Sequence, residues 1–187
     1  MWFCDIDADG DLDLFQNNNG QSGVIIYYEN VRDYSGYVDG QARLLPIYVS
    51  RGEVLESKVP NYPVLTLGDI DNDGDLDMLV GCGNGCGNIY YIENTGSKWA
   101  ASWTARGPIG QTGLVASEDT LSMNYAVTPV LVDMDLDGQL DLSYRNKDDR
   151  VYYFRRVNTV NKNWRQNLQE RGNNLWDNID LGFFSIF

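Results

Sequence analysis

The sequence predicts an all-β protein made of repeated units, each with about four antiparallel strands. Three observations carry this prediction. An acidic segment recurs three times, its copies beginning at residues 5, 69 and 133, which are 64 residues apart both times. Short β-branched and aromatic runs, typical of strands, flank each copy. No segment has the hydrophobic period of a helix. A fixed step of this length indicates a repeat architecture.

The three acidic segments read CDIDADGDLDLF (4–15), GDIDNDGDLDMLVG (68–81) and VDMDLDGQLDLS (132–143). Counted from the first aspartate, positions 1, 3, 5 and 9 are aspartate in every copy and position 6 is glycine. Further along, Asn30, Asn94 and Asn158 keep the same step. Three copies with matched flanks therefore predict three structural repeats without gaps up to this asparagine.

The residue pattern of the middle repeat predicts four strands in order. Residues 62–68 and 76–81 form strands on either side of the acidic loop, and residues 88–94 form a third strand. A turn at 95–97 leads to a less defined fourth strand around 98–104. The third strand recurs at 24–30 and 151–157. The link over residues 35–60 gives no clear strand positions.

About four strands per repeat match the blade of a β-propeller, in which each blade is buried against its neighbours. Three blades do not close a ring, because propellers typically have about 4–8. We therefore expect one domain over 1–187, with repeats at approximately 1–60, 61–124 and 125–187. These would be three consecutive blades of a larger propeller, or half of a six-bladed ring completed by a second chain.

The charge of the chain limits its partners. The 187 residues carry a formal net charge of −13, and 43% of them are apolar, which is enough for a sizeable core. Such acidity disfavours nucleic acid and anionic membranes as partners. No apolar run has the length of a membrane span, and no signal peptide is visible. Because the first repeat begins almost at Met1, we expect an upstream piece to be missing and the protein to be extracellular or on the cell surface.

The acidic segment has the chemistry of a calcium loop. Oxygen ligands at alternating positions suit a hard cation, and a glycine allows the chain to turn around it. We expect side-chain oxygens from positions 1, 3, 5 and 9 and a backbone carbonyl from the variable position 7, with the apolar positions 2 and 8 anchoring the loop. One Ca²⁺ per repeat gives three sites, with candidate ligands Asp5, Asp7, Asp9, Asp11 and Asp13; Asp69, Asp71, Asp73, Asp75 and Asp77; and Asp133, Asp135, Asp137, Gln139 and Asp141.

Two other interpretations of the segment stay open. An EF-hand shares the DxDxDG start, but it needs a bidentate glutamate at position 12 and flanking helices. Position 12 is Gln16, Val80 and Tyr144 here. A solvated acidic turn without metal is the other alternative. Mg²⁺ fits less well than Ca²⁺, because it demands stricter octahedral geometry and keeps its waters.

The pattern DxDxDGxxD followed by an apolar strand resembles the FG-GAP/VCBS repeat, found in the propeller of integrin alpha chains and in many secreted microbial proteins. The resemblance covers essentially the whole chain. It implies a calcium-loaded β-propeller outside the cytoplasm, used for adhesion, ligand recognition or carbohydrate binding, with the ligands given above. The Phe-Gly and Gly-Ala-Pro signatures are reduced to Tyr62-Pro63 and Thr128-Pro129, so the VCBS variant is closer than an integrin chain.

Catalysis is not expected. The chain has no histidine, which removes Ser-His and Cys-His nucleophiles and His-based zinc chemistry. We therefore expect a non-catalytic module that recognises a protein or a glycan. The alternatives are a structural element of a surface fibre or layer, with possible self-association to complete the propeller, and an accessory propeller of a polysaccharide-degrading enzyme.

Aromatic residues and cysteines leave choices open. Trp99 and Trp164 lie at nearly equivalent positions and are expected to be structural, whereas Trp103 and Trp176 are freer binding candidates. Cys82 and Cys86 flank a turn, and either a hairpin disulfide or two free thiols fit.

Overall fold

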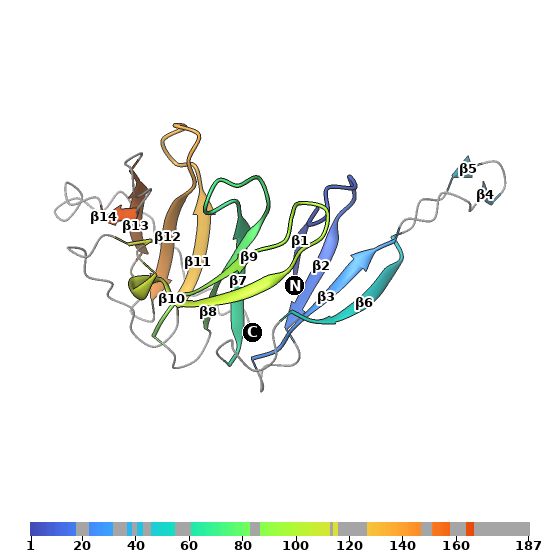
Figure 1. The fold of residues 1–187 in the computed structure, drawn as a ribbon, viewed down its shortest axis with the longest axis horizontal. Coiled ribbons are helices and arrows are strands. Elements are labelled where there is room, and N and C mark those ends of the chain that lie inside the picture. The colour runs from blue at the N-terminus through green and yellow to red at the C-terminus, as the bar shows by residue number, and fades with distance from the viewer. Residues whose placement is uncertain are drawn as a thin grey trace.

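The chain folds almost entirely into antiparallel β-strands (Figure 1). The structure is a computed structural model that describes residues 1–17, 23–31, 37–38, 41–42, 46–54, 61–82, 87–112, 114–115, 127–146, 151–157 and 164–166. Its strands are β1 (Trp2–Cys4), β2 (Asp13–Asn17), β3 (Ile25–Asn30), β4 (Tyr37–Val38), β5 (Gln41–Ala42), β6 (Tyr48–Glu53), β7 (Pro63–Gly68), β8 (Asp77–Cys82), β9 (Tyr90–Asn94), β10 (Trp103–Pro108), β11 (Val127–Val132), β12 (Asp141–Asn146), β13 (Val151–Arg156) and β14 (Trp164–Gln166). One 3-10 turn, η1 (Ile109–Gln111), follows β10.

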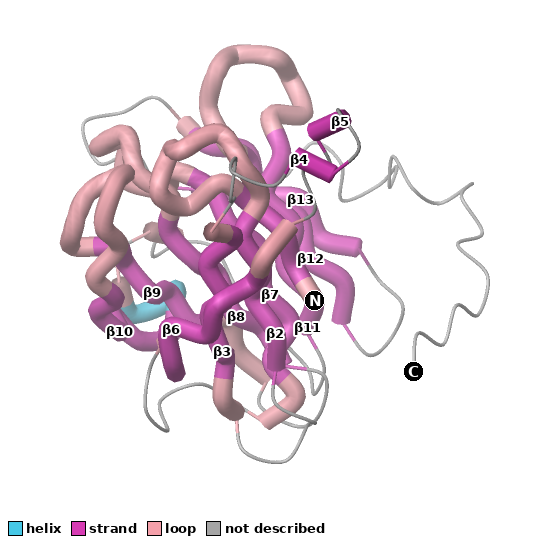
Figure 2. The backbone as a smooth tube through the Cα atoms, turned by 90° about the vertical axis from the view of Figure 1, so that its right-hand side faces the viewer, coloured by secondary structure: helices cyan, strands magenta, loops and turns pink. Residues whose placement is uncertain are grey.

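The strands form three four-stranded units. Unit 1 is the sheet β1-β2-β3-β6. Unit 2 (β7-β8-β9-β10) and unit 3 (β11-β12-β13-β14) belong to one larger sheet, in which the pair Val127–Cys82 joins β11 to β8. Figure 1 shows the three units in a row, and the view in Figure 2 looks along that row. The described strands do not close into a ring, so the propeller itself stays a prediction.

The acidic loops connect equivalent strands of the three units. Loop one (residues 5–13) joins β1 to β2, loop two (69–77) joins β7 to β8, and loop three (133–141) joins β11 to β12. Strands β2, β8 and β12 begin at residues 13, 77 and 141, so the 64-residue step holds through each loop. All three loops lie along the upper edge of the molecule in Figure 1.

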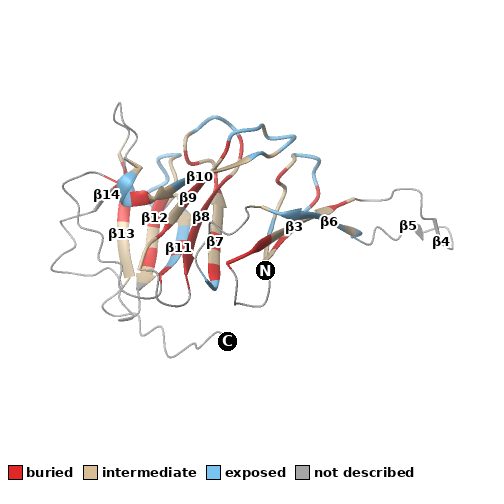
Figure 3. Cartoon of the chain, turned by 60° about the horizontal axis from the view of Figure 1, so that its bottom comes forward, coloured by how far each residue is buried: buried red, intermediate tan, exposed pale blue. Residues whose placement is uncertain are grey.

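The hydrophobic core lies between the units rather than inside any one sheet. One cluster combines unit 1 residues such as Phe15 and Ile25 with unit 2 residues such as Met78 and Ile92. The other cluster combines unit 2 with unit 3. In Figure 3 the buried colour follows β8 in the middle of the row, and β6 at the unit 1 end is largely exposed. Each unit therefore depends on a neighbour to bury its face.

Units 2 and 3 approach most closely at Gly81. A Cβ atom added there would lie 2.0 Å from the carbonyl oxygen of Val127 and 2.7 Å from Cδ of Pro129. Only a residue without a side chain fits between the two strands at this point.

A buried arginine crosses the same boundary. Arg156 on β13 is 2% exposed, and its Nη2 donates a hydrogen bond to the carbonyl oxygen of Ile70 in loop two. The guanidinium lies 5.2 Å from the centroid of the Trp164 ring. Unit 3 is thus tied to the loop of unit 2 by a buried polar contact.

Most of the predicted strands are confirmed, with ends that differ by at most two residues. The fourth strand of the middle unit is an exception, because it runs over 103–108 rather than 98–104. The side-chain oxygen of Asn94 accepts hydrogen bonds from the backbone N–H groups of Gly96 and Ser102. These bonds close a compact turn over 95–102, and the strand begins only after it.

The prediction that the third repeat keeps the 64-residue step without a gap is wrong beyond loop three. The backbone N–H of Asn30 donates to the loop aspartate 17 residues earlier, and Asn94 does the same. In unit 3 the equivalent donor is Arg156, 15 residues after Asp141. The hairpin of unit 3 is therefore two residues shorter, and Arg156 replaces the asparagine. Asn158, which the 64-residue step selects, lies outside the described residues.

The cysteines divide by environment. Cys82 is disulfide-bonded, whereas Cys4 is a free thiol. Cys86 lies outside the described residues. Burial, together with the nearby Asp13 and Asp5, raises the pKa of the Cys4 thiol to about 12. Cys4 therefore stays protonated near neutral pH and is a poor nucleophile.

No helix among the described residues is long and apolar enough to cross a membrane.

Candidate metal centres

The three acidic loops share one backbone conformation. The fourth position has a positive φ in each loop, at 57° for Ala8, 61° for Asn72 and 59° for Leu136. The glycine at position 6 also has a positive φ, between 85° and 96°. Two left-handed residues so close together curl the chain around its own first aspartate. The sequence predicted the glycine, but nothing in an alanine or a leucine predicts the turn at position 4.

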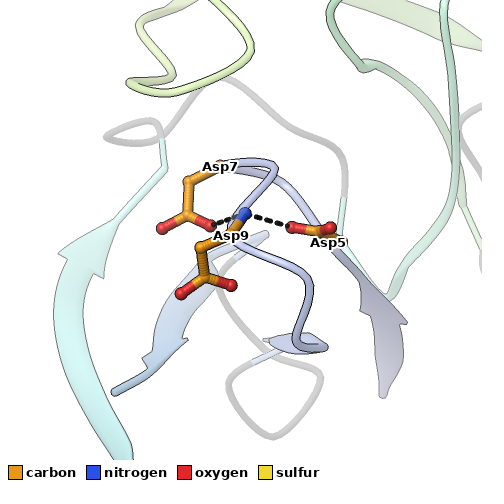
Figure 4. Close-up of side chains that lie close together, drawn as sticks. All are labelled: Asp5, Asp7 and Asp9. Atoms are coloured by element: carbon orange, nitrogen blue, oxygen red, sulfur yellow. Dashed lines mark hydrogen bonds between the residues drawn. The ribbon is translucent and has the colours of Figure 1, made fainter. Parts of the chain in front are cut away.

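The first aspartate of each loop organises the turn. In loop one, Asp5 Oδ1 accepts a hydrogen bond from the backbone N–H of Asp9 at 3.1 Å, and Oδ2 accepts one from Gly10 at 3.1 Å. Figure 4 shows the backbone nitrogen of Asp9 between the carboxylates of Asp5 and Asp7. Loops two and three repeat both bonds to Asp69 and Asp133. Each of these oxygens keeps a lone pair for a further partner.

Three carboxylates converge in every loop. One oxygen from each of Asp5, Asp7 and Asp9 lies within 4.8 Å of the others in loop one. The corresponding groups are Asp69, Asp71 and Asp77 in loop two, and Asp133, Asp135 and Asp141 in loop three. The first and third positions thus converge in all loops, and the ninth position joins them in two.

The ninth aspartate has a second role, which is structural. Asp77 is fully buried, and its carboxylate accepts hydrogen bonds from the backbone N–H groups of Ile70 at 3.0 Å and Asn94 at 2.8 Å. The hydroxyl of Tyr91 donates to it as well, at 3.3 Å. It therefore fastens the start of the loop to the third strand of the unit. Asp13 and Asp141 accept the equivalent backbone bonds in the other loops.

The seventh position differs from its neighbours in burial. Asp11 and Asp75 are buried, at 3% and 5% exposure, whereas Gln139 is half-buried. The Oδ1 atom of Asp75 is buried without a hydrogen-bond partner. Burying a carboxylate oxygen in this way is costly unless a cation or a proton compensates it. The predicted carbonyl ligand at this position stays a prediction.

The carboxylates of loops one and two hold their protons more tightly than free aspartates. Burial raises the pKa of Asp13 to about 6 and that of Asp77 to about 7. Burial, followed by the charges of Asp73, Asp71 and Asp69, raises the pKa of Asp75 to about 6. In loops one and two the ionised form of these carboxylates is therefore unfavourable near neutral pH, and a bound cation would offset that cost.

Anchoring by the apolar positions holds only in part. Ile6 and Ile70 at position 2 are buried, as predicted. Met134, the third member, is 39% exposed, because no further unit covers that side of unit 3 among the described residues. At position 8, Leu12 is exposed on unit 1 for the equivalent reason.

The oxygen clusters have the donor atoms that a hard divalent cation requires. The EF-hand is excluded, because strands rather than helices flank each loop. The donors are oxygens only, with no thiolate or imidazole in the clusters, and this set suits Ca²⁺. The choice of Ca²⁺ among such cations stays a prediction.

Arg155, next to loop three, was missed from the sequence. Arg155 forms ion pairs with Asp135 and Asp137 of loop three. The signal was present, since the third strand reads VYYFRR in unit 3 where units 1 and 2 end in Glu-Asn, but the fixed 64-residue step hid the alignment.

The tryptophan interpretation needs correction. Trp99 is 67% exposed and lines an open pocket of about 340 Å³ beside loop two, formed by residues 73–75 and 96–99. Trp103, expected to be free, packs its ring edge-on against Phe15 in the core. Trp164 is fully buried, as expected for a structural residue. Trp176 lies outside the described residues.

Comparisons with protein-family models, with curated proteins and with solved structures each find no match for this chain.

Proposed function

We propose that this chain is a calcium-binding β-propeller segment of the FG-GAP/VCBS type that works outside the cytoplasm and recognises a protein or a glycan without catalysis. The observation that supports it best is that a cluster of three carboxylate oxygens, always including the first and third positions, recurs three times on one backbone conformation. Charge repulsion within such a cluster is unfavourable when empty, and three independent copies of it argue for a ligand rather than for a solvated turn.

In this proposal the side chains of positions 1, 3 and 5 hold the ion in each loop, and the ninth aspartate serves as both ligand and fastener. The bound ion supplies positive charge that offsets the repulsion among the carboxylates. The residues of the chain do the rest. The backbone N–H groups of positions 5 and 6 orient the first carboxylate, and the ninth aspartate transmits the order of the loop to the third strand.

Calcium titration of the full chain tests the proposal. Modules of this kind bind with dissociation constants of about 0.1–1 mM. At 10 mM calcium, mass action then adds about 1.4–2.7 kcal/mol of stability for each site. We expect calorimetry to detect binding and the melting temperature to rise by several degrees. A melting curve that is the same in calcium and in chelator would refute the metal function.

A pair of variants tests the assigned ligands. Asp73→Ala removes a fifth-position carboxylate and should lower the calcium-induced rise in melting temperature. Glu93→Ala removes a half-buried carboxylate outside the loop that is already paired with Arg106 and should leave the rise unchanged. Equal, small effects of the two changes would contradict the assignment.

The pocket beside loop two supports the recognition part of the proposal. The exposed Trp99 ring offers a surface for stacking, and the Lys98 ammonium lies 4.5 Å from its centroid. Asp73 and Asp75 line the same pocket, so a cation in loop two would lie close to a ligand there. Aromatic stacking beside positive charge suits an acidic glycan.

Glycan-array screening in calcium tests this site. We expect binding to uronic-acid-containing glycans that is lost in Trp99→Ala and in chelator. Tyr62→Ala is the control, because Tyr62 is an exposed aromatic residue that precedes β7, at the end of that strand away from the loop. Binding that survives Trp99→Ala would remove the pocket from the proposal and leave the calcium function standing.

A second candidate function, self-assembly, is favoured by the two end faces of the row. Leu67 of unit 2 packs into the core between units 1 and 2, yet its equivalent in unit 1, Phe3, is 55% exposed. Trp2 and Cys4 pack into that same core, yet their equivalents in unit 3, Val130 and Val132, are exposed. The chain therefore carries both halves of an interface that it already uses between its own units.

A second copy of the chain is the occupant that these faces fit, since unit 3 of one copy would pack on unit 1 of another. Light scattering should then give a dimer, or longer assemblies where the ring does not close. Val132→Asp should yield monomers, and Tyr62→Ser, on another surface, should not. A wild-type chain that stays monomeric at all concentrations would refute assembly.

A further inference from the structure

Two chains of hydrogen bonds join loop two to loop three. The first runs over the exposed tips of the loops. The backbone N–H of Gln139 donates to Asp137 Oδ1 at 2.9 Å, and the side-chain oxygen of Gln139 accepts a hydrogen bond from Asn72 Nδ2 at 3.0 Å. Asn72 lies between Asp71 and Asp73, two candidate ligands of loop two. A change at the fifth position of loop three can therefore reach the tip of loop two.

The second chain of hydrogen bonds is buried. The backbone N–H of Arg156 donates to Asp141, the ninth aspartate of loop three, at 2.7 Å, and its Nη2 donates to the carbonyl oxygen of Ile70. The backbone N–H of Ile70 in turn donates to Asp77, the ninth aspartate of loop two, at 3.0 Å. The two ninth aspartates are therefore linked through one arginine and one isoleucine, and both of these residues are buried.

Neither link has a counterpart between loops one and two among the described residues. The residue of loop one that corresponds to Asn72 is Ala8, which has no side-chain donor. The counterpart of Arg156 is Asn94, whose side-chain oxygen bonds within unit 2 and whose Nδ2 has no hydrogen-bond partner. The two chains of hydrogen bonds are therefore particular to loops two and three.

We propose that loops two and three form a coupled pair of calcium sites, in which occupation of either loop raises the affinity of the other. This inference rests on the calcium function proposed above and concerns the regulation of those sites. An ion in loop three fixes its fifth and ninth carboxylates, and through Gln139 and Arg156 it also orders the backbone of loop two. Order supplied by the first ion does not have to be supplied again by the second, so the second ion binds more tightly.

The charge of Arg156 acts on the affinity of loop two but is not the source of the coupling. Burial lowers the pKa of this guanidinium, whereas Tyr91 and the nearby aspartates of loop two act in the opposite direction. An arginine stays charged at neutral pH, so it repels a cation in loop two whether loop three is filled or empty. This repulsion weakens loop two in both cases and cancels from the ratio of its two affinities.

Backbone amides report each loop separately, because the position 6 glycines Gly10, Gly74 and Gly138 donate to the first aspartate of their own loops. A calcium titration of the ¹⁵N-labelled full chain would follow these three signals. Asp135→Asn takes a charged ligand out of loop three, so that loop two fills while loop three is still empty. We expect the Gly74 midpoint to rise about five-fold, the lower end of typical coupling. Coupling is reciprocal, so Asp71→Asn should raise the Gly138 midpoint by the same factor, and Asp135→Asn should leave the Gly10 midpoint unchanged.

Two substitutions break the links without removing a candidate ligand. Asn72→Ala gives loop two the residue of loop one, where Ala8 has the same left-handed backbone conformation. Arg156→Asn gives unit 3 the asparagine of units 1 and 2 and keeps the backbone N–H that binds the ninth aspartate. With both changes present, emptying loop three should no longer shift the Gly74 midpoint. Asn72→Ala alone, which alters only an exposed side chain, should reduce the shift.

Arg106→Gln is the matched control for charge. Arg106 also interacts with Asp71 of loop two, but it belongs to neither chain of hydrogen bonds. Its removal should change the Gly74 midpoint and leave unchanged the factor by which emptying loop three shifts that midpoint.

The outcomes separate the coupling from the calcium function. If none of the three glycine signals moves in millimolar calcium, the calcium function itself fails. If the signals move but emptying loop three leaves the Gly74 midpoint unchanged or lowers it, the coupling is overturned while calcium binding stands. A shift that is undiminished in Asn72→Ala would overturn the link between the loop tips, and one that survives both substitutions would overturn the two links as the origin of the coupling.

Discussion

Replacing Asp77 with alanine should destabilise the protein both with and without calcium. The ninth aspartate differs from the other candidate ligands in this respect, because it also accepts hydrogen bonds from the backbone of Ile70 and Asn94 in the folded core. The free energy of unfolding from urea denaturation, measured in saturating calcium and in chelator, separates these two roles.

The magnitude follows from the contacts that are lost. Alanine leaves two buried N–H donors without an acceptor, and each costs about 1–3 kcal/mol. The expected loss in chelator is therefore about 2–6 kcal/mol. The assay belongs at pH 6, because the pKa of Asp77 is raised to about 7 by burial and its carboxyl is then mostly protonated. At that pH the carboxyl is mostly uncharged, so the substitution does not also remove a destabilising buried charge. The measured loss of stability then reports the lost hydrogen bonds.

Asp73→Ala is the matched comparison. Its carboxylate accepts a part-buried backbone bond, from the N–H of Asp75 at 3.1 Å. In chelator we expect a loss of about 0.5–1.5 kcal/mol, the usual net value of such a bond. Most of the effect of Asp73→Ala should appear only when calcium is present. If the two variants lose the same stability in chelator, the structural role assigned to the ninth aspartate is refuted.

Three further predictions concern the backbone and the pH dependence. Leu136→Gly should stabilise the chain by about 1 kcal/mol in urea denaturation, since the leucine is 87% exposed and held at a φ of 59°. Leu12→Gly is the control and should destabilise the chain, because Leu12 has no positive φ. A loss of stability in Leu136→Gly would contradict the argument that the backbone is strained there. Gly81→Ala should cost about 3 kcal/mol or more, because its Cβ would meet the Val127 carbonyl oxygen, and an unchanged melting temperature would refute this close approach. The raised pKa of Asp77 predicts that the metal-free protein gains stability as pH falls from about 7.5 to 5.5, since the folded state then binds more protons than the unfolded state. Protons and calcium compete, so the calcium-induced rise in melting temperature should shrink over the same range. A rise that grows toward pH 5.5 would refute this predicted pH dependence.

The strands could be predicted because their signals are local. Residues 63–68 and 77–82 combine β-branched residues with clear boundaries at the acidic loop. The fourth strand could not be placed, because its start depends on the Asn94 side chain closing a turn up to Ser102. A hydrogen bond from a side chain to a backbone group eight residues away does not change the periodicity of hydrophobic residues, so the sequence gives no sign of it.

The loops were predictable in chemistry but not in detail. Alternating aspartates and a glycine indicate a curled acidic loop, and the structure places three carboxylate oxygens together in each copy. The left-handed conformation of Leu136 could not be predicted, because leucine has no preference for it. The ion pairs of Arg155 could not be predicted, because unit 3 has a hairpin two residues shorter, as the strand register and the hydrogen bond of Arg156 to Asp141 show.

The buried Arg156 makes the two boundaries in the row unequal. It donates across the boundary to Ile70, whereas its counterpart Asn94 uses its side-chain oxygen for Gly96 and Ser102 within its own unit. Units 2 and 3 should therefore protect their amides from deuterium exchange as one cooperative body, and unit 1 should open at lower free energy. Proteolysis or mechanical force would then unfold unit 1 first, while units 2 and 3 stay packed together.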